Sequence, residues 1–422
     1  MSSVSRRDFA RLVAIGGSAP FLTSLPKSWI SAPLPRTPVE PDEKFWKEVR
    51  ARFLLPSDLI FLNAANLCPT SMPVVEALER NTRFLDANPS SASRSRLGEG
   101  REESRRQIAK ALGVTAEEIV ITRNTSEANN IVSSGLDLKA GDDVVVFSDN
   151  HPSNLTAWRQ KAQRFAFSVT EVAAENPHPG ADAYVEAFSR AITPRTRVVA
   201  MTHVTNTIGD RLPVEELCRI ARERGVLTVV DGAQTFGALD VNVRTLGADF
   251  YTGSAHKWPC GPKETGVLFV HNAIHDRIHP SLVSLYPGAV GISRTLEGFG
   301  QRDEAALATL GAAIGLQNDI GRAAIEARVY QLVQRLATGL RTIEGVSLRT
   351  NTDPGLSAGI VVFKPGSLEP RRVVTALYDR YRIACASAGG ASRPGVRFSP
   401  HFYNTLDEMD RVIDSVRKIV AV

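Results

Sequence analysis

The sequence predicts an α/β protein with a large three-layer α/β/α domain, built on a mainly parallel seven-stranded sheet, and a smaller α+β C-terminal domain. Seven short apolar runs lie between residues 118 and 271, and segments with helical spacing separate several of them. Strands that alternate with helices favour a parallel sheet covered on both faces. The chain has 422 residues, of which 43% are hydrophobic and 23% are charged. This composition is typical of a globular protein with a sizeable core.

The first thirty-odd residues are predicted to be a targeting signal. Residues 5–9 read Ser-Arg-Arg-Asp-Phe, and an apolar run over residues 12–22 follows. This run is too short to span a bilayer. A basic start before a short apolar stretch is typical of a signal peptide, and the paired arginines before Phe9 resemble a twin-arginine (Tat) signal for export of folded proteins. We therefore expect export to the periplasm through the Tat machinery, with a disordered basic tail as the alternative.

The seven predicted strands cover residues 118–122, 143–148, 165–172, 197–202, 226–230, 249–253 and 266–271. The clearest helices before residue 291 are predicted at 98–112, 126–136, 181–192 and 214–224. Beyond residue 291 the pattern changes to helix over 302–340, a strand at 360–364 and an amphipathic helix at 406–420. We therefore expect a signal and linker over 1–34, a large domain over 60–295, and a small lobe made of 43–59 and 296–422.

Charge and cysteine content argue against several classes of function. The formal net charge is +5, and the N-terminal 27 residues contribute +3 of it, with four basic residues against one acidic residue. The rest of the chain is close to neutral, so no nucleic-acid partner is expected. The four cysteines are scattered without a CxxC pair, which predicts neither a zinc ribbon nor a disulfide framework, and no metal site is expected.

Polar residues follow several predicted strands, at the sheet edge where α/β proteins bind ligands. Thr125 and Ser126 open a helix after the first strand, where they could bind a phosphate or simply cap the helix. His151 follows the second strand and could face a ligand ring, act as an acid or base, or be structural. Asn206 follows the fourth strand, where it could bind a ligand or form an Asx turn.

Two further strand ends carry the more specific residues. Asp231 ends a buried apolar strand in Asp-Gly-Ala-Gln234, where the carboxylate needs either a cationic partner, such as a heterocycle nitrogen, or a helix to cap. Lys257 follows 26 residues later in Ser254-Ala-His256-Lys. A partly buried lysine with a lowered pKa can form a Schiff base, whereas a lysine in a loop is usually only solvated.

Taken together, these motifs resemble fold-type I pyridoxal-phosphate enzymes, specifically the class V aminotransferase family in its isopenicillin N epimerase-like and cysteine desulfurase-like branch. Asp231-Gly-Ala-Gln, Ser254-Ala-His-Lys-Trp and Arg397-Phe-Ser-Pro-His-Phe-Tyr-Asn read like that family. The resemblance extends from about Phe61 to Val420. It implies the PLP-dependent transferase fold, pyridoxal 5'-phosphate as the cofactor, and a homodimer with its site near the subunit interface.

The resemblance also implies a role for each residue. Lys257 resembles the lysine that binds the cofactor as a Schiff base and moves the substrate α-proton. Asp231 resembles the partner of the pyridine nitrogen, and His151 the residue that stacks on the ring. The remaining cofactor contacts are implied for Asn206 and Gln234 at the ring hydroxyl, and for Thr125, Ser126, Ser254 and His256 at the phosphate. Arg397 resembles the clamp for the substrate carboxylate, and Asn66 lies near the segment that lines the substrate site.

The sequence departs from the family pattern at two places. Cysteine desulfurases carry a nucleophilic Cys in a loop before the carboxylate-binding Arg, but residues 387–395 contain none, and Cys385 lies upstream. A persulfide route is therefore not expected. Where the family often has a Thr that reaches the neighbouring subunit's phosphate, this chain has Gln301, in a Gly-Gln-Arg-Asp segment closer to the epimerase-like branch.

The function expected from the sequence is a pyridoxal-phosphate enzyme acting on an amino acid or primary amine, with a class V aminotransferase named first. An amino-acid epimerase is one alternative, because epimerisation and amino-group transfer share the same first proton abstraction. A C–S or C–C lyase that acts at the β- or γ-carbon is another. Two remoter alternatives are an inactive binding protein of this fold and a metal hydrolase that uses His151, His203, Asp231 and His256. Neither the substrate nor the reaction outcome can be predicted from the sequence.

Overall fold

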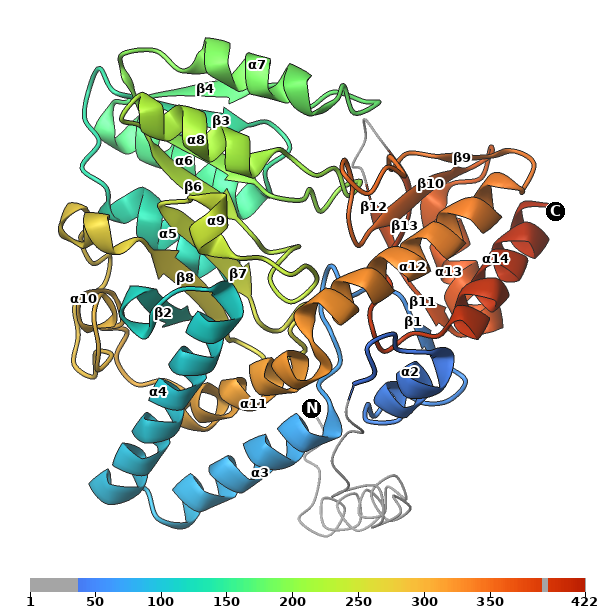
Figure 1. Cartoon of the computed structure of the whole chain (residues 1–422), viewed down its shortest axis with the longest axis horizontal. Helices are drawn as coiled ribbons and strands as arrows, with labels where there is room; N and C mark the ends of the chain where they lie inside the picture. The colour runs from blue at the N-terminus through green and yellow to red at the C-terminus, as the bar shows by residue number, and fades with distance from the viewer. Residues whose placement is uncertain (1–36, 389–393, 422) are drawn as a thin grey trace, which may run out of the picture. The chain divides into compact units, whose positions relative to one another are not determined.

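The computed structural model of the chain describes residues 37–388 and 394–421, so the predicted Tat signal lies outside the described residues. All seven predicted strands form one sheet, in the order β2-β8-β7-β6-β5-β3-β4 (Figure 1). The strands are β2 (Ile119–Thr122), β3 (Asp143–Phe147), β4 (Ser168–Val172), β5 (Thr196–Thr202), β6 (Leu227–Asp231), β7 (Phe250–Ser254) and β8 (Gly266–Val270). Strand β8 runs opposite to the other six strands and pairs antiparallel with both β2 and β7. The prediction of a mainly parallel seven-stranded sheet is confirmed.

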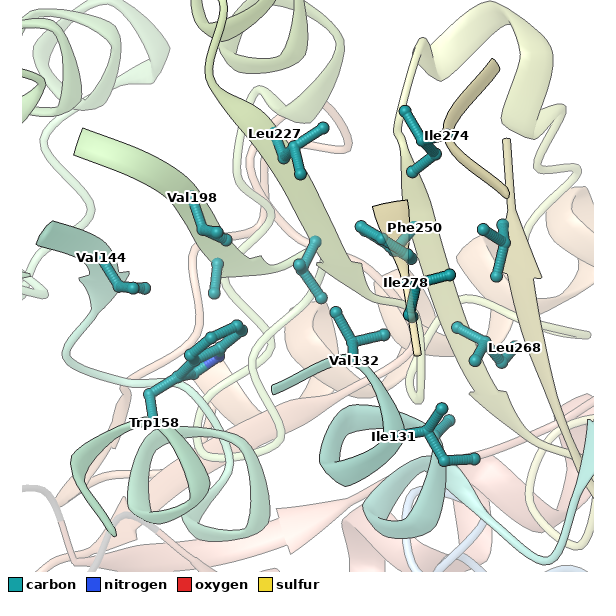
Figure 2. Packing of buried hydrophobic residues seen from close by; sticks show 14 of the residues in the cluster. Ile131, Val132, Val144, Trp158, Val198, Leu227, Phe250, Leu268, Ile274 and Ile278 are labelled. Carbon is teal, nitrogen blue, oxygen red and sulfur yellow. The ribbon is translucent and has the colours of Figure 1, made fainter. Parts of the chain in front are cut away.

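Helices cover both faces of this sheet. On one face, α5 (Thr125–Gly135) and α6 (Pro152–Phe165) bury Ile131, Val132 and Trp158 against alternate residues of the strands (Figure 2). On the other face lie α7 (Ala181–Ala191) and α8 (Val214–Glu223), and the Phe147 ring of β3 contacts the Tyr184 ring of α7, with 5.4 Å between ring centroids. The expected three-layer arrangement follows from this two-sided burial.

Several element boundaries differ from the predictions. The strand expected over 165–172 begins at Ser168, because α6 continues to Phe165 and ends in a left-handed residue, Ala166. The helix expected at 98–112 is longer and begins at Ser91 (α4, Ser91–Leu112). The remaining helices before residue 300 are α2 (Glu43–Arg50), α3 (Met72–Ala87), η2 (Ala116–Glu118), α9 (Val243–Leu246), η3 (Asn272–Arg277) and α10 (Ser293–Leu296).

The C-terminal part contains a second, antiparallel sheet and four helices. The sheet order is β12-β13-β10-β9. Its strands are β9 (Val346–Leu348), β10 (Val361–Pro365), β12 (Ala386–Ala388) and β13 (Gly395–Phe398), and the helices are α11 (Glu304–Ile320), α12 (Arg322–Arg341), α13 (Pro370–Tyr381) and α14 (Leu406–Val420). The short strand β1 (Ile60–Phe61) pairs in parallel with β11 (Ile383–Ala384), so Ile60 and Leu62 belong to the core of this part.

The topology brings the predicted site residues to one edge of the large sheet. Because β8 is antiparallel to both β2 and β7, the strands β2, β3, β5, β6 and β7 all point the same way. Their carboxyl ends therefore share one edge, where ligands bind in such sheets. Among the described residues, no helix is both long and apolar enough to cross a membrane.

Candidate active site

Lys257 lies in the turn that follows β7, at the shared sheet edge. Burial lowers the pKa of its amine from the usual 10.5, the nearby Asp231 carboxylate raises it, and the Arg397 guanidinium lowers it. An amine must lose its proton before it can attack a carbonyl carbon, so this lowered pKa suits Schiff-base chemistry. The interpretation of Lys257 as a merely solvated loop lysine does not fit its burial.

Asp231 ends β6 and is only 1% exposed. Its Oδ2 accepts a hydrogen bond from Asn129 Nδ2 at 2.9 Å, and its Oδ1 accepts one from the backbone N–H of Ala233 at 3.0 Å. The residues that follow form turns, and the next helix begins at Val243, so the alternative that Asp231 caps a helix is wrong. A buried carboxylate with two neutral donors favours a further, cationic partner.

Asn129 is a site residue that the sequence did not reveal. It lies on α5, is 1% exposed, and its Oδ1 accepts a hydrogen bond from Thr252 Oγ1 at 2.9 Å while its Nδ2 holds Asp231. The amide therefore fixes which way the Asp231 carboxylate points. Only the approach of α5 to β6 and β7 reveals this role, since nothing in the sequence around Asn129 distinguishes it from any helical asparagine.

Thr125 and Ser254 meet at the N-terminus of α5. Their hydroxyl oxygens are 2.8 Å apart, and the backbone N–H of Thr125 donates to Ser254 Oγ at 2.9 Å. The helix is capped by Asn124, whose side chain accepts from the N–H of Glu127, so the alternative that Thr125 or Ser126 serves as the cap is wrong. Hydroxyls and free N–H groups at a helix N-terminus suit a phosphate.

Ser126, Gln301 and His256 are the other residues predicted at the phosphate. Ser126 lines a surface cavity with Asn124 and Leu282, and Gln301 lines another cavity that also contains Leu282. Gln301 is exposed, and whether it reaches a second subunit stays a prediction. Burial, with the charges of Lys257 and Lys263, lowers the pKa of His256 to about 4, so this ring is neutral at pH 7.

His151 is the N-cap of α6 and also faces the charged groups of the site. Its Nδ1 accepts from the backbone N–H of Ser153 at 3.2 Å and lies 2.8 Å from Ser153 Oγ. Burial and the charge of Lys257 lower its pKa, whereas Asp231 raises it. The residue is therefore a neutral ring held in one orientation, a property that suits stacking on another ring, which stays a prediction.

Gln234 and Asn206 each form hydrogen bonds to other parts of the site. Gln234 donates from Nε2 to the carbonyl of Ala65 at 3.1 Å and accepts at Oε1 from Trp258 Nε1 at 2.9 Å. These bonds tie Gln234 to the segment after β1 and to the Lys257 turn. The carbonyl of Asn206 accepts from the Arg397 guanidinium at 2.6 Å.

Arg397 comes from β13 of the second sheet, and Asn206 follows β5 of the first. One amino group of Arg397 bonds to Asn206, the other donates to Asn63 Oδ1 at 3.2 Å, and Nε has no hydrogen-bond partner in the described part of the chain. Burial lowers the pKa of Arg397 to about 10. Such a cation is suited to an anionic ligand. In the segment after β1, the asparagine that bonds to Arg397 is Asn63 and not the predicted Asn66, which is exposed.

The four residues of the metal-hydrolase alternative do not form a ligand cluster. Within residues 37–388 and 394–421, the one group of three potential ligand atoms within 4.8 Å of one another is Cys68, Cys260 and His401. His203 instead lines a separate cavity with Arg211, and neither of its ring nitrogens has a hydrogen-bond partner in the described part of the chain. The geometry therefore offers no support for a zinc hydrolase built on His151 and His203.

The chain belongs to the family described as Aminotransferase class-V, which it matches over residues 60–412. It is 31% identical to the isopenicillin N epimerase of Streptomyces clavuligerus, covering 88% of this chain and 97% of that one. It is 29% identical to a probable cysteine desulfurase of Methanothermobacter thermautotrophicus, covering 89% and 98%. The apo cysteine desulfurase structure from Thermococcus onnurineus NA1 superposes with a TM-score of 0.79 at 30% identity, over 89% of this chain and 98% of that one.

The fold is therefore the PLP-dependent transferase fold, and the cofactor of this family member is pyridoxal 5'-phosphate. The residues present fit that group. A buried carboxylate at Asp231, an amine of lowered pKa at Lys257 and a hydroxyl-lined helix N-terminus at Thr125 match its pyridine nitrogen, aldehyde and phosphate in turn.

Proposed function

We propose that this enzyme acts on a free α-amino acid, holding its carboxylate with Arg397 and moving its α-proton with Lys257. The observation that carries the proposal is the buried Arg397 guanidinium, which shares the electrostatic environment of Lys257. A guanidinium that is 8% exposed and hydrogen-bonded only to neutral oxygens in the described chain attracts an anion. An amino acid presents that anion beside the carbon that reacts.

Each residue then has a defined task. Bound pyridoxal phosphate supplies an electron sink for the electron pair left when the α-proton departs. Lys257 Nζ takes that proton, and burial, which lowers its pKa, favours the unprotonated amine that can act as a base. Asn129 orients Asp231, which would pair with the protonated pyridine nitrogen, and Thr125 with Ser254 would bind the phosphate. Arg397 and Asn63 fix the substrate carboxylate.

The outcome depends on where the proton returns. The outcome predicted first from the sequence is transamination, in which the α-carbon does not regain its proton and the amino group is transferred. The similarity to an isopenicillin N epimerase favours a second outcome, in which the proton returns to the α-carbon and its configuration inverts. A desulfurase reaction has less support, because the sequence has no Cys between Ala386 and the C-terminus.

The test is to incubate the purified holoenzyme with single amino acids in deuterated water. Deuterium at the α-carbon, detected by mass spectrometry or NMR, supports proton transfer by Lys257, and it should be lost in Lys257→Ala. A keto acid product then identifies an aminotransferase, whereas an inverted amino acid identifies an epimerase. Absence of exchange with every amino acid, while Arg397→Ala behaves like wild type, would contradict the proposal.

We also propose a homodimer whose interface includes residues 282–286. Leu282, Val283 and Leu285 are 51%, 89% and 72% exposed, which is unusual for a run of apolar side chains. Leu282 also lines the cavities that contain Ser126 and Gln301, which places this segment beside the phosphate end of the site. Light scattering after size-exclusion chromatography should give twice the chain mass, and Val283→Asp should shift it to the monomer.

Export through the Tat pathway to the periplasm remains part of the proposal, supported by Arg6 and Arg7 in the sequence. Cell fractionation of the native host should find the enzyme in the periplasm. Replacement of both arginines by lysine should retain it in the cytoplasm. Wild-type enzyme found only in the cytoplasm would contradict this part.

A further inference from the structure

Three buried side chains from distant parts of the sequence lie close together beside Lys257. Cys68 follows β1, Cys260 lies three residues after Lys257, and His401 follows β13. The two sulfur atoms and one ring nitrogen of His401 all lie within 4.8 Å of one another. The three residues are between 0% and 2% exposed. Their separation in the sequence explains why spacing gave no sign of a metal site.

The histidine of this cluster has a free ligand position. Its Nε2 lies 2.6 Å from the carbonyl oxygen of Trp258, and because a carbonyl only accepts, Nε2 carries the proton. Nδ1 is then an unprotonated nitrogen, and it has no hydrogen-bond partner within residues 37–388 and 394–421. A histidine that donates one ring N–H to a backbone carbonyl, with a free lone pair on the other nitrogen, has the arrangement of a metal ligand.

We propose that Cys68, Cys260 and His401 form a structural binding site for a thiophilic divalent cation, with Zn²⁺ as the natural candidate. Two thiolates and one imidazole are a ligand set that zinc prefers, and they cancel its charge, so the ion can be buried. One oxygen at the edge of the cluster can complete the coordination: Tyr403 Oη lies 3.7 Å from Cys68 Sγ.

Binding replaces two protons. The thiols of Cys68 and Cys260 each lose a proton as their S–Zn bonds form, so one Zn²⁺ enters and two protons leave, with no oxidation or reduction. The ion would then join three segments that already touch. The N–H of Cys68 donates to the carbonyl of His256 at 2.9 Å, and the His401 ring bonds to the carbonyl of Trp258 in the same turn. The site therefore fixes the Lys257 turn against β1 and β13, independently of the reaction proposed above.

The experiment uses tag-free holoenzyme, stripped of metal with a chelator and titrated with Co²⁺ under reducing conditions. The expected result is one Co²⁺ per chain, with ligand-field bands at wavelengths beyond the absorption of pyridoxal phosphate, displacement of Co²⁺ by Zn²⁺, and a higher melting temperature. Cys68→Ser, Cys260→Ser and His401→Asn should each lose the bands. Cys218→Ser is the matched control, since Cys218 is equally buried but lies on α8, and it should keep them.

A measurement on wild type guards against variants that fail to fold. Zn²⁺ should protect two of the four thiols of the native protein from alkylation, and peptide mapping should identify them as Cys68 and Cys260. No Co²⁺ bands and no protection would overturn the proposal. If only two of the four cysteines of the metal-free protein titrate as thiols, and a reductant restores the other two, the proposal is overturned in favour of a Cys68–Cys260 disulfide.

Discussion

At the residue scale, the buried amine of Lys257 lowers the stability of the folded chain. Folding lowers the pKa of this lysine, so its protonated form destabilises the native chain. That cost is complete below the lowered pKa and disappears as pH rises to the value of an unfolded lysine, 10.5. Lys257→Met should therefore abolish activity yet stabilise the cofactor-free protein by about 0.5–2 kcal/mol near neutral pH.

The pH dependence distinguishes this cause from better packing. In urea unfolding of cofactor-free wild type and Lys257→Met, the difference in stability should shrink as pH rises from about 7 toward 10. A difference that stays constant with pH would mean that the methionine stabilises by packing alone. Lys263→Met would not serve as a control, because Lys263 donates hydrogen bonds to Cys68 and Thr70.

Asn129 provides a second test at this scale. In Asn129→Ala, Asp231 loses one of its two donors and Thr252 loses its acceptor. Leaving such buried groups unpaired costs about 1–3 kcal/mol, and the misdirected Asp231 should weaken cofactor binding. Urea unfolding and a pyridoxal-phosphate titration measure the two effects. Asn130→Ala, at an exposed position on the same helix, should change neither.

At the element scale, two glycines of α4 predict opposite effects. A Cβ at Gly100 would lie 2.8 Å from Ala308 Cβ on α11, whereas one at Gly98 would meet nothing within 4 Å. Gly98→Ala should therefore stabilise the protein by about 0.5–1 kcal/mol through helix propensity. Gly100→Ala should lose that gain, because α4 and α11 must move apart, and become destabilising. Thermal unfolding of the two variants compares them directly.

The sequence predicted strands better than it predicted their connections, for a physical reason. Strands buried on both faces are continuous apolar runs, so β3 and β6 stand out. The helix α3 was not predicted, because its buried residues are few and its packing partner α11 lies far along the chain. The start of α4 was missed for a related reason, since its first turns are rich in serine and arginine and carry little apolar periodicity.

At the scale of the whole molecule, the site depends on both parts of the chain. Residues that follow strands of the large sheet, such as Asp231 and Lys257, could be predicted because each strand end is visible in the sequence. Their supports could not, because Asn63 reaches Arg397 across 334 positions and Asn129 reaches Asp231 across 102. Chemistry-bearing residues follow local patterns, whereas the groups that orient them depend on tertiary packing.

Acid stability is the last property at this scale. Burial lowers the pKa of five of the eight histidines, namely His151, His178, His203, His256 and His401. A histidine kept neutral by folding contributes no penalty above its unfolded pKa, about 6.5, and destabilises the native chain as pH falls below it. The free energy of unfolding should therefore fall steeply from pH 7 to pH 5, because several buried histidines contribute to the same slope.

A substitution of His203 isolates the contribution of one buried histidine to the pH dependence of the unfolding free energy. Its pKa is about 3, it is 2% exposed, and neither ring nitrogen has a hydrogen-bond partner among the described residues, so an apolar replacement sacrifices no hydrogen bond seen there. His203→Leu should reduce the pH slope of the unfolding free energy by about 1.4 kcal/mol per pH unit between about pH 6 and 5. Equal slopes for His203→Leu and wild type would mean that water or a bound anion reaches His203 through the cavity it shares with Arg211.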